Sequence, residues 1–166
     1  DPGLGPLSAG QAENAFWDPA YFIEHAPPQR SIPRGERHTR SELVAIANSY
    51  FDGLSAHNGK IIIAHEGCVR IENGALTTQR PIAGGGLTDC TAEGPMANIY
   101  AITARRYLVD EVAGAALGLA LFQRKPGVNM PRNLLAEWFY VDAGKIRSIY
   151  AAMYYPGPDA MLPNWP

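Results

Sequence analysis

The last third of the chain constrains the fold most, because four long β-prone segments follow one another there with only short turns between them. Residues 99–111, 115–124, 134–142 and 145–155 are rich in aliphatic and aromatic side chains, which favour extended backbone. Segments joined by such short turns pair as antiparallel hairpins. The sequence therefore predicts a curved antiparallel sheet of about four to six strands.

One amphipathic helix precedes these strands. Thr39 and Glu42 have the spacing of a capping box, in which the hydroxyl and the carboxylate each satisfy a free backbone N–H group. Apolar side chains then recur at steps of three and four residues, which predicts a helix over 40–54 with one buried face: Leu43, Ile46, Ala47, Tyr50 and Leu54. A helix followed by a meander of strands indicates the α+β class.

The length of 166 residues fits a single domain preceded by an arm. Residues 1–37 are rich in Pro and Gly and are predicted to form an extended N-terminal arm, with the folded domain over 38–166. The arm carries Phe16, Trp17, Tyr21 and Phe22. Because so many aromatic side chains do not suit a solvated tail, we expect the arm to pack on the domain or on a second subunit.

Composition excludes several classes of function. The formal net charge is −2, so broad attraction to nucleic acid or to an anionic membrane surface is not expected. No apolar run approaches the roughly 20 residues of a membrane-spanning helix. Gly84-Gly85-Gly86 lacks the Lys and the strand–turn–helix setting of a phosphate-binding loop. With no clustered His or Cys ligands either, no metal site and no bound cofactor are expected.

The two cysteines give little information by themselves. Cys68 and Cys90 lack the spacing of a metal site or of a redox motif. Free structural thiols are favoured over one disulfide, and a cytoplasmic location is expected. The chain starts at Asp1 rather than Met, so a removed signal segment is the alternative.

Strand alternation selects the first candidates for catalysis. Arg106 and Asp110 point to the same side of a regular strand. An Arg beside an Asp keeps the carboxylate ionised and orients it as a base. The alternatives are a structural salt bridge, or a register shifted by one residue that turns Arg105 and Tyr107 inward instead.

Two further side chains are predicted to assist catalysis. His65 lies in an irregular segment that would border a pocket mouth, and a neutral imidazole suits proton transfer. Tyr154 supplies a phenol that can stabilise a developing oxyanion. A packing or surface role is the alternative for both residues.

Substrate binding is assigned to a second group of residues. Arg70 alternates out of an apolar segment and can bind a substrate oxygen or cap the following turn. Tyr50 and Tyr150 are candidates to line an apolar pocket. Either Glu137 or Trp138 faces inward, never both, because they are neighbours on one strand. A buried Glu137 would have a raised pKa, and the alternative for it is a salt bridge at the rim.

Four stretches of sequence together carry a family resemblance. They are EWFYVDAGKI at 137–146, SYFDGL at 49–54, CVRIENG at 68–74 and RRYLVDE at 105–111. These motifs resemble one uncharacterised branch of the nuclear-transport-factor-2-like (NTF2-like), or SnoaL-like, superfamily, over about residues 39–155. The arm lies outside the resemblance.

The resemblance implies a cone in which a curved sheet and helices enclose an apolar pocket, often in a dimer. The superfamily includes dehydratases, isomerases, cyclases, epoxide hydrolases and binding domains without activity, so the fold alone does not fix the function. The branch is similar to bacterial lyases that remove formaldehyde from lignin-derived diarylpropanes without a cofactor. The expected function is therefore a cofactor-independent lyase that acts on a small aromatic substrate by acid/base elimination.

Two alternatives to the lyase remain open. One is a dehydratase or isomerase of a biosynthetic pathway, and the other is a non-catalytic module that binds a small molecule. In each case the expected partners are a small apolar or aromatic molecule and further copies of the chain, as a homodimer or a higher homo-oligomer.

Overall fold

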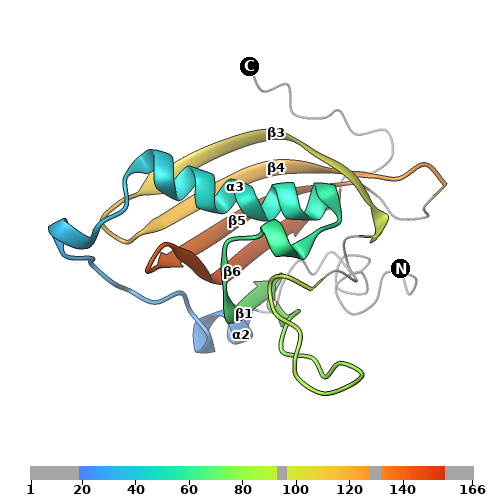
Figure 1. The fold of residues 1–166 in the computed structure, drawn as a ribbon, viewed down its shortest axis with the longest axis horizontal. Helices are drawn as coiled ribbons and strands as arrows, with labels where there is room; N and C mark the ends of the chain where they lie inside the picture. Colours follow the sequence, from blue (N-terminus) through green and yellow to red (C-terminus); the bar gives the residue numbers. More distant parts are fainter. Residues whose placement is uncertain (1–18, 93–96, 128–131, 156–166) are drawn as a thin grey trace.

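The fold is a mixed α+β cone built on one curved, unclosed sheet (Figure 1). The computed structural model describes residues 19–92, 97–127 and 132–155. Its six strands have the order β2-β1-β6-β5-β4-β3. They are β1 (Ala64–Glu72), β2 (Ala75–Leu76), β3 (Ile99–Asp110), β4 (Ala115–Arg124), β5 (Asn133–Asp142) and β6 (Lys145–Tyr154). The helices are α2 (Pro19–Glu24), α3 (Arg40–Ala56) and the 3-10 turns η2 (Arg34–Glu36) and η3 (Gly59–Ile61).

The predicted meander is confirmed, and the sheet has one parallel pair in addition. β3, β4, β5 and β6 pair antiparallel in chain order, whereas β1 runs parallel to β6. The predicted antiparallel sheet therefore gains one parallel pair, because a segment expected to be irregular supplies β1. Parallel partners lie far apart along the chain, so no local pattern shows this pairing.

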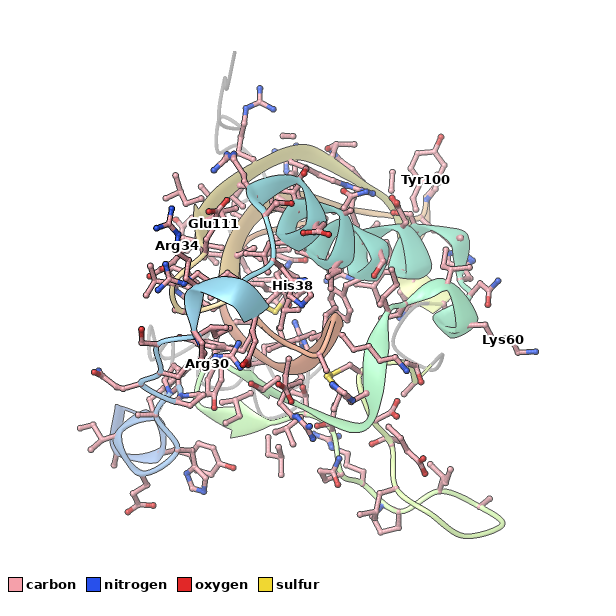
Figure 2. The ribbon with its side chains drawn as sticks, turned by 60° about the vertical axis from the view of Figure 1, so that its left-hand side comes forward. Arg30, Arg34, His38, Lys60, Tyr100 and Glu111 are labelled. Carbon is pink, nitrogen blue, oxygen red and sulfur yellow. A yellow bond between two sulfur atoms is a disulfide. The ribbon has the colours of Figure 1, made fainter. Side chains whose placement is uncertain are left out.

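Helix α3 covers the concave side of the sheet, as expected from its apolar face. Thr39 and Glu42 form the capping box that starts the helix. The Phe51 ring meets the Phe139 ring of β5 edge to face, with centroids 5.4 Å apart. Figure 2 shows the sheet curling around the helix, with Lys60 and Tyr100 pointing outward. The core therefore lies between α3 and the inner faces of the central strands.

Gly118 lets α3 approach the sheet closely. A Cβ atom at this position would lie 2.9 Å from Phe51 Cε2 and 3.1 Å from Phe139 Cε2. Gly118→Ala should therefore lower the free energy of unfolding by about 1–3 kcal/mol, as overpacking does. Urea denaturation checks this value. Gly35→Ala is the matched control, since no heavy atom lies within 4 Å of its added Cβ. Equal effects of the two substitutions would contradict the packing argument.

The second half of the N-terminal arm docks on the turn between β3 and β4. The Arg30 guanidinium donates to the carbonyl oxygens of Ala113, Gly114 and Val141, and it lies over the Tyr140 ring at 5.7 Å. The Ile32 amide donates to the carbonyl of Val112, which extends this contact. Phe16 and Trp17, on which the arm prediction also depends, lie outside the described residues.

The two cysteines form a disulfide, so the expectation of free thiols is wrong. Cys68 of β1 is bonded to Cys90 in the loop before β3, with Cα atoms 5.3 Å apart. The fold brings together two segments that are separated by 22 residues, and spacing alone did not indicate this. Disulfides persist in oxidising compartments and are rare in the cytosol, which speaks against the expected cytoplasmic location. Within the described ranges, no helix has the length and apolar character needed to cross a membrane.

Candidate functional site

Arg106 and Asp110 lie on the outer side of β3, so the prediction that they face the interior is wrong. Both side chains are exposed. Arg106 donates to the carbonyl of Arg105 at 2.9 Å. Asp110 Oδ1 accepts from the amides of Val112 and Ala113, each at 2.9 Å. Asp110 therefore caps the β3–β4 turn and does not pair with Arg106.

A β-bulge causes this change of register. Ile102 is buried, and regular alternation from it would turn Arg106 inward. The pairing of β3 with β4 is irregular between Thr103 and Arg106, and Ala104 has a φ of 55°. A bulge inserts one extra residue and reverses the faces beyond it, so Arg105 points inward instead.

Arg105 and Tyr107, the alternative pair, connect β3 to α3. Arg105 donates to Asn48 Oδ1 at 2.7 Å and to Asp52 Oδ1 at 2.5 Å. The Tyr107 hydroxyl donates to Asn48 Oδ1 at 2.8 Å, and burial raises the pKa of this tyrosine to about 12. The hydrogen bonds of these side chains go to one another, which suits a structural role for the network.

A groove of about 680 Å³ opens where the first turn of α3 meets the end of β3. Arg105 and Arg106 contribute to its wall, so Arg106 lines a surface hollow rather than the interior of the cone. The other lining residues are Thr39, Arg40, Ser41, Val44, Tyr107 and Glu111.

The other two predicted catalytic residues do not meet in one place. His65 is half-buried, and its Nε2 lies 2.8 Å from the carbonyl oxygen of Asp142. Tyr154 lies near the end of β6 with 54% of its surface exposed. The structure therefore does not bring together the four residues assigned to catalysis from the sequence.

The choice between Glu137 and Trp138 is resolved in favour of Glu137. Glu137 is fully buried among the inward-facing residues of β5, whereas Trp138 is exposed on the outer face. Tyr150 is the partner of Trp138 across β5 and β6, so it shares that outer face. Of the five predicted binding residues, Trp138 and Tyr150 are thus on the wrong side to line the interior.

The interior of the cone holds a buried cluster of charge centred on Arg70. Its Nε and Nη2 atoms donate to Glu137 Oε1 at 3.0 and 2.6 Å. Its Nη1 atom donates to Glu72 Oε2 and, at 3.4 Å, to Thr77 Oγ1. Arg70 and Glu72 are each 8% exposed. One guanidinium therefore bridges two carboxyl groups where an apolar interior was expected.

Burial dominates the electrostatics of Glu137. Loss of water raises the pKa of its carboxyl group, against the opposing effect of the Arg70 charge. Burial alone would lower the pKa of Arg70. The negative charge of Glu72 and the other neighbours of Arg70 outweigh burial and raise the pKa of Arg70 well above its ordinary value. Arg70 is thus a fixed positive charge, and Glu137 holds a proton to higher pH than a solvated glutamate.

One oxygen of Glu137 has no hydrogen-bond partner among the described residues. Both bonds from Arg70 go to Oε1, and the buried Oε2 atom makes no hydrogen bond to this part of the chain. Unpaired buried polar atoms are costly and rare in native proteins. A carboxyl group with a raised pKa and one free oxygen has the features of a proton donor.

Tyr50 supplies a phenol from α3 beside this cluster. It is buried, and burial raises the pKa of its hydroxyl, with further influence from Arg70, Glu137 and Glu72. The phenol therefore stays protonated at neutral pH and can act as a hydrogen-bond donor. Of the predicted site residues, the structure brings together Tyr50, Arg70 and Glu137.

Glu72 was not among the site residues predicted from the sequence. Alternation along a strand places Arg70 and Glu72 on one face. The sequence pattern singled out Arg70 from this segment but not Glu72, because the middle of the chain lacks a clear strand pattern. Asn133 was also missed. It is fully buried and accepts from Arg124 at 2.6 Å through Oδ1, while its Nδ2 atom has no hydrogen-bond partner within the described ranges.

As for metals, no group of three or more His, Cys, Asp or Glu side chains within residues 19–92, 97–127 and 132–155 could hold an ion.

Comparison with solved structures identifies the fold. The chain is similar to an NTF-2 like protein of unknown function from Burkholderia xenovorans LB400, with a TM-score of 0.52 and 10% identity over 75% of this chain and 90% of that chain. It is also similar to BvnE pinacolase from Penicillium brevicompactum (TM-score 0.50, 11% identity, 70% and 88% covered) and to AusH from Aspergillus nidulans (TM-score 0.50, 11% identity, 70% and 86% covered). At these identities the likeness shows the fold alone, which is the NTF2-like cone.

Sequence comparison gives a narrower result. No curated protein matches the chain. The family model described as "Domain of unknown function (DUF8021)" matches residues 36–153, which include α3, the first five strands and all of β6 but its last residue. The chain therefore belongs to the DUF8021 family.

Proposed function

We propose that this protein is an acid/base enzyme for a small, largely apolar molecule that carries hydroxyl groups, and that it works without a bound cofactor. The observation that carries the proposal is the buried Arg70, which bridges Glu72 and the fully buried Glu137. Burying charges away from water is costly, and well-packed apolar side chains often give equal or greater stability. Such a cluster inside the cone is therefore better explained by chemistry than by stability.

The three polar groups have complementary roles in this proposal. Glu72 is paired with Arg70 and keeps 10% of its side chain exposed, so we assign its carboxylate as the base. Glu137 has a raised pKa, so it is the acid that returns a proton. Arg70 and the Tyr50 hydroxyl stabilise the negative charge that develops on the substrate oxygen. Together these groups can remove one proton and supply another within one water-poor site.

The most specific form of the proposal is a formaldehyde lyase acting on a 1,2-diarylpropane-1,3-diol. Glu72 takes the proton of the terminal hydroxymethyl group, and the adjacent carbon–carbon bond breaks to release formaldehyde. Its electron pair forms the double bond of a stilbene, and the benzylic hydroxyl leaves as water with the proton of Glu137. Proton exchange with solvent then restores both carboxyl groups. A dehydratase or isomerase would use the same acid and base without the carbon–carbon cleavage.

A non-catalytic binding module is the second candidate, and one observation favours it. Glu137 is fully buried, so a substrate reaches its carboxyl group only after neighbouring side chains move. A module that binds a small molecule elsewhere in the cone would keep the charged cluster as part of its core.

The test is to incubate the folded, oxidised protein with a 1,2-diarylpropane-1,3-diol and with a library of phenolic compounds. We expect loss of the diol, with stilbene absorbance and released formaldehyde in equal amounts. Conversion of another compound without formaldehyde would indicate an isomerase or dehydratase. Binding without any conversion would support the binding module, and absence of both would contradict the proposal.

A further inference from the structure

The loop between β2 and β3 contacts β1 beside Arg70 at several points. The Thr77 amide and its Oγ1 atom donate to the carbonyl oxygen of Arg70 at 2.9 and 3.1 Å. The Arg70 amide donates to Thr78 Oγ1 at 2.9 Å. Two consecutive threonines thus form hydrogen bonds with the backbone N–H and the backbone carbonyl of Arg70.

The same loop folds back on itself, and its second part is attached to β1 by the disulfide. The Gln79 amide donates to the Thr88 carbonyl, and the Thr88 amide donates to the Arg80 carbonyl, each at 2.8 Å. This second part of the loop ends at Cys90, which forms the disulfide with Cys68. The first part of the loop, at Thr77 to Arg80, therefore lies between β1 and the second part, which the disulfide attaches to β1.

The stretch of β1 before Val69 lacks regular pairing, whereas Val69 to Glu72 pair with β6. Its pairing with β6 is interrupted between Ala64 and Val69, and Gly67 has a φ of 73°. Cys68 is the last residue of this irregular stretch and faces inward two residues before Arg70. The disulfide therefore fixes the strand at the point where regular pairing resumes.

We propose that the Cys68–Cys90 disulfide, with Thr77 and Thr78, forms a clasp that positions the Arg70 guanidinium between Glu72 and Glu137. The site is then complete only in the oxidised chain. These four residues are positioning residues, since they act through Arg70. The biological relevance of the clasp rests on the proposed function, but its effect on Arg70 can be measured without any ligand.

The chemistry of opening the clasp is a two-electron reduction. A dithiol such as dithiothreitol gives two electrons and two protons to the disulfide, which becomes two thiols, while the reagent becomes a cyclic disulfide. Cys68 is fully buried and Cys90 is 4% exposed, so reduction requires local opening of the loop. Substitution of both cysteines gives the same open clasp without that step.

The experiment is a carboxyl NMR titration of protein labelled with ¹³C-glutamate, carried out on Cys68→Ala/Cys90→Ala and on Thr78→Val. The charged and titratable groups that act on Glu137 are Arg70, Glu72, Tyr50 and Tyr107. Because Arg70 is the charge that lowers the pKa of Glu137, a displaced Arg70 shifts that pKa upward. We also expect about tenfold faster hydrogen exchange at the amides of Arg70 and Thr77, as for loss of one hydrogen bond.

Two further variants make the result specific. Thr78→Ser keeps the hydroxyl group and should restore both readouts. Leu43→Ala removes a fully buried side chain about two turns of α3 before Tyr50, and costs about 2–5 kcal/mol without touching the loop. It should leave the Glu137 titration unchanged.

Several outcomes would overturn the clasp. One is an unchanged Glu137 titration in both Thr78→Val and the cysteine variant, and another is an equal shift in Leu43→Ala. Thr78→Val retains the disulfide, so the test remains decisive if the cysteine variant does not fold. The proposed function fails by a different result, which is absence of both binding and conversion by the intact protein.

Discussion

Glu137→Gln should lower turnover of the converted compound by about 10²–10⁴-fold, the usual effect of removing a general acid or base. The amide cannot deliver the proton, but it keeps the size of the side chain and an oxygen for Arg70 to bind. Glu72→Gln should have an effect of similar size, because it removes the base. Steady-state kinetics on protein that unfolds at the same urea concentration as the parent would measure both values.

Arg106→Met is the informative comparison for these two variants. Arg106 is exposed on the outer side of β3, so we expect turnover close to that of the parent. The opposite pattern, with activity lost in Arg106→Met and kept in Glu137→Gln, would show that the surface groove rather than the buried cluster carries the chemistry.

The raised pKa of Glu137 also predicts how stability depends on pH. The folded-state pKa lies above the ordinary value of 4.5, so the folded chain binds this proton more tightly than the unfolded chain. Its contribution to stability is full below the unfolded pKa and is lost as the pH rises through the folded pKa. Urea denaturation at a series of pH values should show this decline in the parent. The decline should be weaker in Glu137→Gln, and equal slopes would contradict the assignment.

Removing the disulfide should lower the stability of the protein strongly. Cys68→Ala/Cys90→Ala should lower the free energy of unfolding by about 3 kcal/mol, the value for a closed loop of this length; the cysteines are 22 residues apart. The bond restricts the unfolded chain and, in the folded chain, anchors the loop that covers the edge of β1. Urea denaturation of the variant and of the parent, both without reductant, measures the difference.

A matched control separates the bond from the side chains. The parent should lose the same stability when unfolded in dithiothreitol, while the variant should not respond to the reagent. A loss below about 1 kcal/mol in both experiments would mean that the loop is held by its hydrogen bonds alone.

Local sequence determined α3 and the four long strands of this protein. The capping box at Thr39 and the apolar spacing of the next 15 residues predicted α3, because both depend on residues within one or two turns. Gly114 and Gly144 predicted the hairpins of β3–β4 and β5–β6, because tight turns need residues that adopt positive φ. Both glycines have positive φ in the structure. The α+β class followed from these features, and the cone followed from the family resemblance.

Only the tertiary structure decided which side chains meet. The bulge at Ala104 turned Arg106 outward, and a bulge depends on the partner strand rather than on the sequence beside it. The pairing of β1 with β6 and the Cys68–Cys90 bond join residues far apart along the chain. These long-range contacts bring Arg70 and Glu72 of β1 close to Glu137 of β5. The whole curved sheet is needed to place these two strands, which are far apart along the chain, around one interior.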